Sequence, residues 1–138
     1  MINRIKWLLK NFKQSVCFSD DISPYDLFFI HPQLMVIVSF VNLYCHNNKL
    51  EFKITSAIRT ESQDKKLGAV SSSHQEGRSV DFSLQGFKKS QIEELRHEIN
   101  TRYSDIGAVS SSNGLSRPIV IHDNGNGYHA HLQVRPNL

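Results

Sequence analysis

Two short segments, far apart in the chain, carry the side chains best suited to metal chemistry. The first reads Ser-Ser-His-Gln-Glu-Gly-Arg-Ser-Val-Asp over residues 72–81, and the second reads Tyr-His-Ala-His over residues 128–131. Together they offer imidazole and carboxylate groups, a ligand set that suits tetrahedral zinc. Three protein ligands would leave the fourth position for water, which distinguishes catalytic from structural zinc. The pattern therefore predicts a zinc hydrolase.

The spacing of the two C-terminal histidines indicates which way their side chains point. His129 and His131 are two residues apart. On a strand their side chains leave the same face, while Ala130 and Leu132 point the other way. An exposed strand face with two ordinary histidines explains this pair equally well, so the pair alone does not decide the matter.

The first segment adds a second source of ligands. A serine-rich loop leads to His74, Gly77 permits a tight backbone, and Asp81 begins or lies within a strand. A loop followed by a returning strand can bring His74 and Asp81 to one metal ion. A surface histidine and a solvated aspartate are the ordinary alternative for any such pair.

The elements that must position these residues follow from hydrophobic periodicity. Ser90-Gln91-Ile92-Glu93 has the spacing of a capping box and opens a helix. Asn-Gly-Asn-Gly over 124–127 is a strong turn signal, so the last two strands form a hairpin. These features predict an α+β domain with N-terminal helices, a mainly antiparallel sheet and a C-terminal β-hairpin. The sequence predicts helices at 2–12, 32–46, 61–66 and from 90 onward, and strands at 50–55, 80–84, 105–109, 117–123 and 128–135.

Length and composition bound the possible functions. The 138 residues suffice for one domain, which we divide into an N-terminal extension, 1–31, and a core, 32–138. Hydrophobic residues make up 39% and charged residues 21% of the chain, a globular balance. The net charge is +3, but no block of basic residues alternates with aromatic ones, which argues against nucleic acid. A basic surface is compatible with an anionic polymer such as a bacterial cell wall.

The sequence also bears on location and on the cysteines. The apolar run 27–45 approaches the length of a membrane span, but Pro32 and several polar residues favour a buried helix. We see no signal peptide and expect synthesis in the cytoplasm, with action on the cell wall after release or from a phage particle. Cys45 is expected to be a buried thiol, and a bridge to Cys17 stays open.

The two segments resemble a known family. Ser72, His74, Gly77 and Asp81, followed by the terminal His-Ala-His, resemble the motifs of the D-alanyl-D-alanine carboxypeptidase/dipeptidase family of zinc peptidases. That family includes VanY- and VanX-type enzymes and several phage endolysins, and the Hedgehog signalling domain shares its fold. The pattern is met except that Ser79 replaces a small alanine. Residues 56–63 are also similar to the family's stretch after its first strand, and the resemblance covers about residues 32–135.

The resemblance implies a role for each matching residue. His74, Asp81 and His131 would be the zinc ligands. His129 would lie beside the zinc and hydrogen-bond the developing oxyanion. Arg59 would hold the substrate carboxylate or stabilise the transition state, a task that suits its permanently charged, bidentate guanidinium.

The general base departs from the family pattern. Many relatives carry an acidic residue three or four places before the last ligand, where this chain has Tyr128 and Gly127. We assign the base to Asp123, across the turn, although aspartate is also favoured there as a turn residue. His122 is expected on the opposite face. Gln63 is a candidate for hydrogen bonding to the substrate, with a role on the helix surface as the alternative.

The implied activity is hydrolysis of a peptide of bacterial peptidoglycan. The enzyme would be a carboxypeptidase or endopeptidase for D-amino-acid-containing stem peptides, ending in D-Ala-D-Ala or containing an L-Ala–D-Glu link, and we expect a monomer. Loops such as 107–117 would set which bond is cut. Two other classes stay open: a zinc-binding module without hydrolysis, and a structural or virion protein on the same fold.

Overall fold

The computed structural model describes residues 16–69, 71–123 and 128–136. The helix expected at 2–12 and the turn at 124–127 lie outside these residues. The described elements, in chain order, are β1 (Val16–Phe18), the 3₁₀ helix η1 (Pro24–Phe28), α2 (Pro32–Asn47), β2 (Phe52–Ser56), α3 (Glu61–Leu67), β3 (Ser79–Ser83), α4 (Lys89–Arg102), β4 (Ile119–Asp123) and β5 (Tyr128–Gln133).

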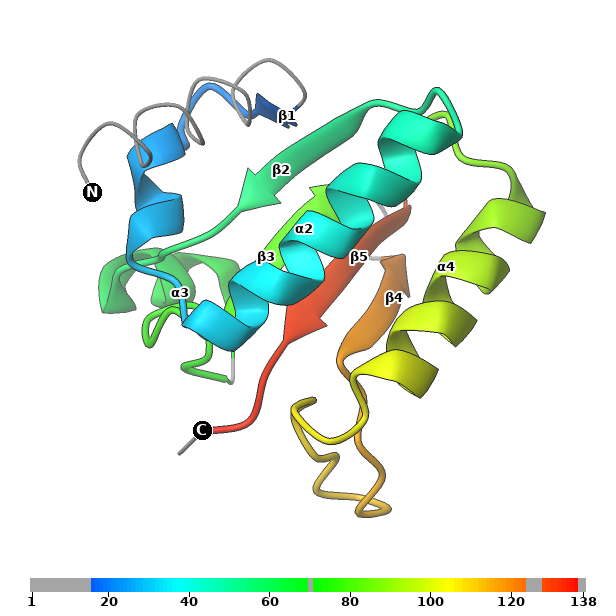
Figure 1. The fold of residues 1–138 in the computed structure, drawn as a ribbon. Helices are drawn as coiled ribbons and strands as arrows, with labels where there is room; N and C mark the ends of the chain where they lie inside the picture. Colours follow the sequence, from blue (N-terminus) through cyan, green and yellow to red (C-terminus); the bar gives the residue numbers. More distant parts are fainter. Residues whose placement is uncertain (1–15, 70, 124–127, 137–138) are drawn as a thin grey trace, which may run out of the picture.

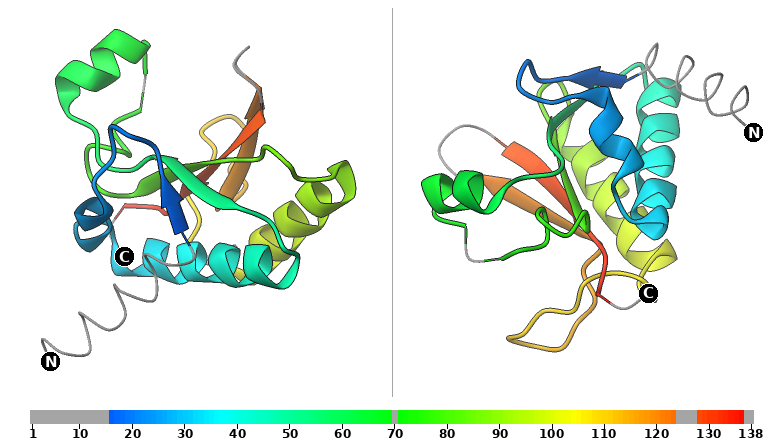
Figure 2. Two further views of the ribbon diagram at one scale, coloured as in Figure 1. Left: turned by 90° about the horizontal axis from the view of Figure 1, so that it is seen from above. Right: turned by 90° about the vertical axis from the view of Figure 1, so that its left-hand side faces the viewer.

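One five-stranded sheet organises these elements. Its strand order is β1-β2-β3-β5-β4. Only the β1–β2 pair is parallel, and the other neighbours are antiparallel. Helices α2 and α4 cover one face, whereas α3 lies on the other side (Figures 1 and 2). The predicted α+β class, the mainly antiparallel sheet and the terminal β4–β5 hairpin are therefore confirmed.

Helix α2 supplies much of the core. Pro32 occupies its first turn, where a missing N–H costs nothing, and the His31 ring accepts a hydrogen bond from the Gln33 N–H. Apolar side chains then recur every three or four residues along one face. Five of these residues are almost completely buried: Leu34, Ile37, Val38, Val41 and Cys45. They pack with the inward-facing residues of the sheet, including Val80, Phe82, Ala130 and Leu132.

Helix α4 begins one residue earlier than its expected cap. Lys88 is the N-cap, and its backbone N–H donates to the side chain of Gln91 at 2.9 Å. Ser90 therefore lies inside the first turn, and the expected capping box is wrong by two positions. The predicted apolar stripe holds, because Leu95 and Ile99 are buried and Ile92 packs against the core.

Two strand predictions differ from the structure. Residues 105–109 form no named strand, and pairing there is limited to isolated bridges at Gly107 and Val109. The three-residue β1 was not expected. Its register with β2 joins positions 36 residues apart, such as Val16 and Phe52. A strand this short has too little periodicity to stand out, and its pairing is a tertiary property.

The structure bears on the apolar run 27–45 and on the two cysteines. Among the described residues, no helix is both long and apolar enough to cross a bilayer. Cys17 and Cys45 are both free thiols, so the bridge left open above is absent. Cys45 is buried in α2, and that burial raises its pKa to about 12.

Candidate metal centre

The sheet face opposite α2 and α4 carries the candidate site, and we call it the site face. Along β3 and β5 the side chains alternate, so the apolar residues enter the core and the polar ones reach the site face. The register places Asp81 directly opposite His131. Cross-strand neighbours have Cβ atoms about 5 Å apart, so this pair is positioned by the backbone ladder itself.

His74 reaches the same point from the loop between α3 and β3. The loop is anchored at Gly77, whose carbonyl accepts a hydrogen bond of 2.8 Å from the His31 N–H. Gly77 has a φ of +68°, and a Cβ there would lie 2.5 Å from the Phe29 carbonyl oxygen. Glycine is therefore required by both conformation and space. The anchored loop buries the His74 side chain, which is 1% exposed.

Hydrogen bonding sets which nitrogen of His74 is available. Its Nδ1 lies 2.8 Å from the Ala57 carbonyl oxygen, an acceptor, so Nδ1 must carry the proton. Its Nε2 therefore holds a lone pair, 3.3 Å from Oδ2 of Asp81. Among the described residues, this buried Nε2 has no hydrogen-bond partner. A histidine whose second nitrogen is fixed by a backbone carbonyl is the usual arrangement of a metal ligand.

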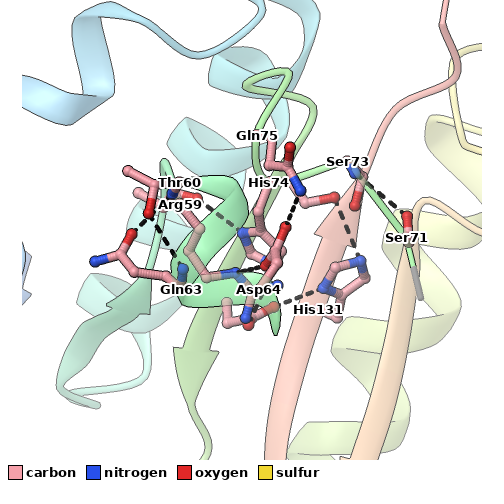
Figure 3. A network of polar contacts seen from close by, with 12 residues as sticks. Arg59, Thr60, Gln63, Asp64, Ser71, Ser73, His74, Gln75 and His131 are labelled. Carbon is pink, nitrogen blue, oxygen red and sulfur yellow. Dashed lines mark hydrogen bonds and ion pairs between the residues drawn. The ribbon is translucent and has the colours of Figure 1, made fainter. Parts of the chain in front are cut away.

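The ring of His131 is oriented in the corresponding way. Its Nε2 lies 3.2 Å from the side-chain oxygen of Gln133 and 3.4 Å from the Ser79 hydroxyl. The Gln133 oxygen accepts from Nε2, so Nδ1, which lies 2.6 Å from Oδ1 of Asp81, is the nitrogen that faces the carboxylate. Figure 3 shows His74 arriving from its loop and His131 from β5.

Three ligand atoms thus converge on one point. One atom from each of His74, Asp81 and His131 lies within 4.8 Å of the others. Burial raises the pKa of Asp81, but its contacts with His131 and His74 outweigh this and hold the pKa far below its usual range. The lowered pKa keeps Asp81 ionised, and a carboxylate beside two imidazole nitrogens is a ligand set for a divalent cation. The two nitrogens and one oxygen fit zinc.

The hairpin register corrects two placements. His122 pairs with His129, and Asp123 pairs with Tyr128. Paired residues share a face, so His122 lies on the site face and the expectation that it faces away is wrong. Asp123 takes the alternate position, on the face turned away from His131. The structure therefore gives no geometric support to Asp123 as the base.

Two histidines outside the ligand set adjoin the centre. The rings of His122 and His129 stack with centroids 5.3 Å apart, and His122 lies 5.9 Å from the ring of His131. Partial desolvation, with the neighbouring His131 and His129, lowers the pKa of His122. The signal for His122 was present in the sequence, because a four-residue turn at 124–127 pairs residue 122 with 129.

Arg59 and Gln63 take part in a network beside the centre (Figure 3). The Nε of Arg59 lies 2.8 Å from Oδ1 of Asp64, which is 3% exposed and also accepts from Gln75 at 2.7 Å. The side-chain oxygen of Gln63 accepts from the Thr60 N–H and closes the capping box of α3. Sequence reasoning missed Asp64 and Gln75, whose contact joins α3 to the following loop across 11 residues.

Two grooves flank the ligand cluster. The first groove, of about 550 Å³, is lined by Arg59, Gln63, Asp81 and His129 among others. The second groove, of about 430 Å³, is lined by Arg78, Arg117, Val120 and Gln133 together with four serines. Asp81 borders the first groove, and the neighbours of His131 border the second. The candidate centre therefore borders the first groove directly, and the second groove lies beside residues that contact His131.

Comparison of the chain with protein-family models, curated proteins and solved structures gave no match. The resemblance to zinc peptidases accordingly rests on the motifs described above, and the specific fold of that family stays a prediction.

Proposed function

We propose that this protein is a zinc-dependent peptidase that hydrolyses stem peptides of bacterial peptidoglycan. The observation that carries the proposal is the convergence of two imidazole nitrogens and one ionised carboxylate at a single point. His74, Asp81 and His131 would hold the zinc ion. The Ala57 carbonyl and the Gln133 side chain would hold the two rings in the correct tautomers. A three-ligand set leaves a coordination position for water, as catalytic zinc requires.

A bound zinc ion would supply Lewis acidity and would lower the pKa of a water molecule to about 7. The chain's own residues supply the rest. We assign to His129, which lines the first groove, a hydrogen bond to the carbonyl oxygen of the substrate. With Asp123 turned away, we assign proton transfer to the leaving amine to His129 and its stacked neighbour His122.

The first groove supports a peptide as the ligand. Its volume of about 550 Å³ lies in the range of small-molecule sites, and its wall combines apolar Ile22 and Ile58 with polar Ser83 and Gln63. Arg59 also lines this groove, with its Nε tied to Asp64. We assign to Arg59 the role of positioning the groove wall, because its ion pair with Asp64 holds that wall against α3.

The experiment has two parts. Purified protein should contain about one zinc ion per chain by elemental mass spectrometry. The variants His74→Ala, Asp81→Ala and His131→Ala should lose that zinc. His97→Ala, which changes an exposed histidine on α4, is the matched control and should retain it. Incubation of the zinc-loaded protein with purified muropeptides should then release fragments that mass spectrometry identifies.

One observation favours a second function, a zinc-binding module without hydrolysis. Asp123 faces away from the ligands, and the family position for an acidic base holds Tyr128. Stoichiometric zinc without cleavage of any muropeptide would support the module and reject the peptidase. Purified protein that binds no zinc would reject both functions.

A further inference from the structure

The second groove differs from the first in its charge. Arg78 and Arg117 line it, and no acidic residue does so among the described residues. The first groove combines Asp21 and Asp81 with Arg59 and Lys66, so its formal charges balance. The second groove is therefore the more cationic flank of the metal centre.

Arg117 carries the positive charge in the second groove that is available to pair with a ligand. Arg78 is committed, because its Nε pairs with Glu76 and one terminal nitrogen donates to the Val134 carbonyl at 2.9 Å. The Arg117 side chain is exposed and makes no ion pair or hydrogen bond with the described residues. Four serines line the same groove: Ser71, Ser73, Ser110 and Ser111. A guanidinium with neighbouring hydroxyls is a site for a carboxylate.

The second groove is also connected to the zinc ligands. Gln133 accepts from the Nε2 of His131, and its side-chain amide donates to the Arg117 backbone carbonyl at 3.0 Å. Val120, which also lines the groove, is the direct cross-strand neighbour of His131. The groove therefore begins immediately beside a ligand, and the loop that bears Arg117 connects α4 to β4 (Figure 1).

We propose that the second groove binds the C-terminal carboxylate of the peptide substrate and that Arg117 is the residue that recognises it. This inference rests on the peptidase function proposed above and selects a carboxypeptidase-type reaction. Water adds its oxygen to the acyl carbon, the amide C–N bond breaks, and the proton passes to the leaving amine. The main body of the peptide occupies the first groove, and its short C-terminal end lies toward Arg117.

Spacing limits the length of the leaving group. His131 and Gln133 lie on the same face of β5, two residues apart, which corresponds to about 7 Å along a strand. An extended peptide also advances about 3.3–3.6 Å per residue. A carboxylate near Gln133 and Arg117 is thus one or two residues beyond a scissile bond at the metal. The expected products are single C-terminal amino acids or dipeptides.

The test compares one peptide in two forms. N-acetyl-Lys-D-Ala-D-Ala is prepared as the free acid and as the C-terminal amide. Its binding to zinc-loaded protein is measured by NMR titration, and its cleavage is measured by mass spectrometry. The wild-type protein should bind the acid about tenfold more tightly than the amide or better, as expected for a charge-assisted hydrogen bond. Shifts should centre on the amides of Ser110, Ser111 and Gln133.

Three variants locate the carboxylate. Arg117→Gln should abolish the preference for the acid, and Arg117→Lys should keep part of it. Lys66→Gln removes the same charge from the first groove and should leave the preference intact. Loss of the preference in Lys66→Gln but not in Arg117→Gln would place the carboxylate in the first groove and overturn the inference.

The remaining outcomes separate the two proposals. No binding, or equal binding of acid and amide by the wild-type protein, overturns the carboxylate site. Equal cleavage of acid and amide, unaffected by Arg117→Gln, overturns it while the peptidase function stands. An acid preference that depends on Arg117, without any cleavage, supports the carboxylate site and rejects the peptidase.

Discussion

The register of the β4–β5 hairpin decides which single side chains face the candidate centre. A shift of one position would exchange the faces of His122 and Asp123. In the observed register His122 stacks on His129, and Asp123 lies opposite Tyr128. The proton-transfer assignment therefore follows from pairing rather than from the nearness of Asp123 in the sequence.

Substitution of these side chains tests the assignment. Asp123→Asn should leave the hydrolytic rate nearly unchanged, because this carboxylate does not face the metal ligands. His129→Ala should reduce the rate about 10²–10⁴-fold, the usual contribution of general acid–base catalysis. Rates are measured on the muropeptide cut by the wild-type protein, with zinc content as the control. A loss of rate in Asp123→Asn that matches the loss in His129→Ala would restore Asp123 as the base.

The sequence was sufficient to predict the cluster of His74, Asp81 and His131. The family resemblance implied these three residues as ligands, and the structure brings them together. The sheet face on which the Asp123 side chain lies was not predicted. That prediction required working out which residues of the two strands pair across the turn. Asp64 carried no local signal, since its partner Gln75 is 11 residues away and the ion pair with Arg59 depends on how α3 packs.

At the scale of elements, the loop between α3 and β3 must hold a buried imidazole without regular secondary structure. Gly77 anchors it against the chain that enters α2, through the hydrogen bond from His31. Helix α3 was predicted over 61–66, and its Thr60 cap and Gly68 end are visible in the sequence. The close approach of the loop to Phe29 could not be predicted from the sequence, because it joins segments about 50 residues apart.

Gly77→Ala should disrupt this anchor. The left-handed conformation costs an alanine roughly 1–2 kcal/mol, and the clash with the Phe29 carbonyl adds to it. We expect a loss of more than about 2 kcal/mol in the free energy of unfolding, measured in urea, together with weaker zinc binding. Gly86→Ala is the matched control, since Gly86 has a φ of +86° but no atom within 4 Å of the added Cβ. Equal losses in the two variants would show that the contact with Phe29 is unimportant.

At the scale of the whole molecule, the sheet separates folding from chemistry. One face packs on α2 and α4 and holds the apolar core, whereas the site face holds polar groups that gain little from burial. The composition could predict a single core but not this division, because sheet order is set by long-range pairing. The two faces are linked through β3 and β5, whose residues alternate between them.

Removal of zinc should therefore lower stability without unfolding the domain. A ligand that binds only the folded state at a free concentration of 1,000 times its Kd adds about 4 kcal/mol to the free energy of unfolding. For a chain of this size we expect a rise in Tm of roughly 10–15 °C between chelated and zinc-saturated protein. Calorimetry measures the shift. His74→Ala should show no such zinc-dependent rise, and an equal Tm with and without zinc in the wild-type protein would contradict a native metal site.

The pairing of Asp81 with His131 affects how fast the backbone around the candidate centre can open. Both residues lie on interior strands, so their backbone groups belong to the hydrogen-bond ladder between β3 and β5. Amide protons in such central ladders exchange with solvent only through near-global opening. The backbones of these two residues can then separate only when the sheet opens, whereas the backbone at His74 can move with its loop. Amide hydrogen exchange should be slow along β3 and β5 and faster over 71–78, so that a metal ion bound here would be gained and lost through the His74 side.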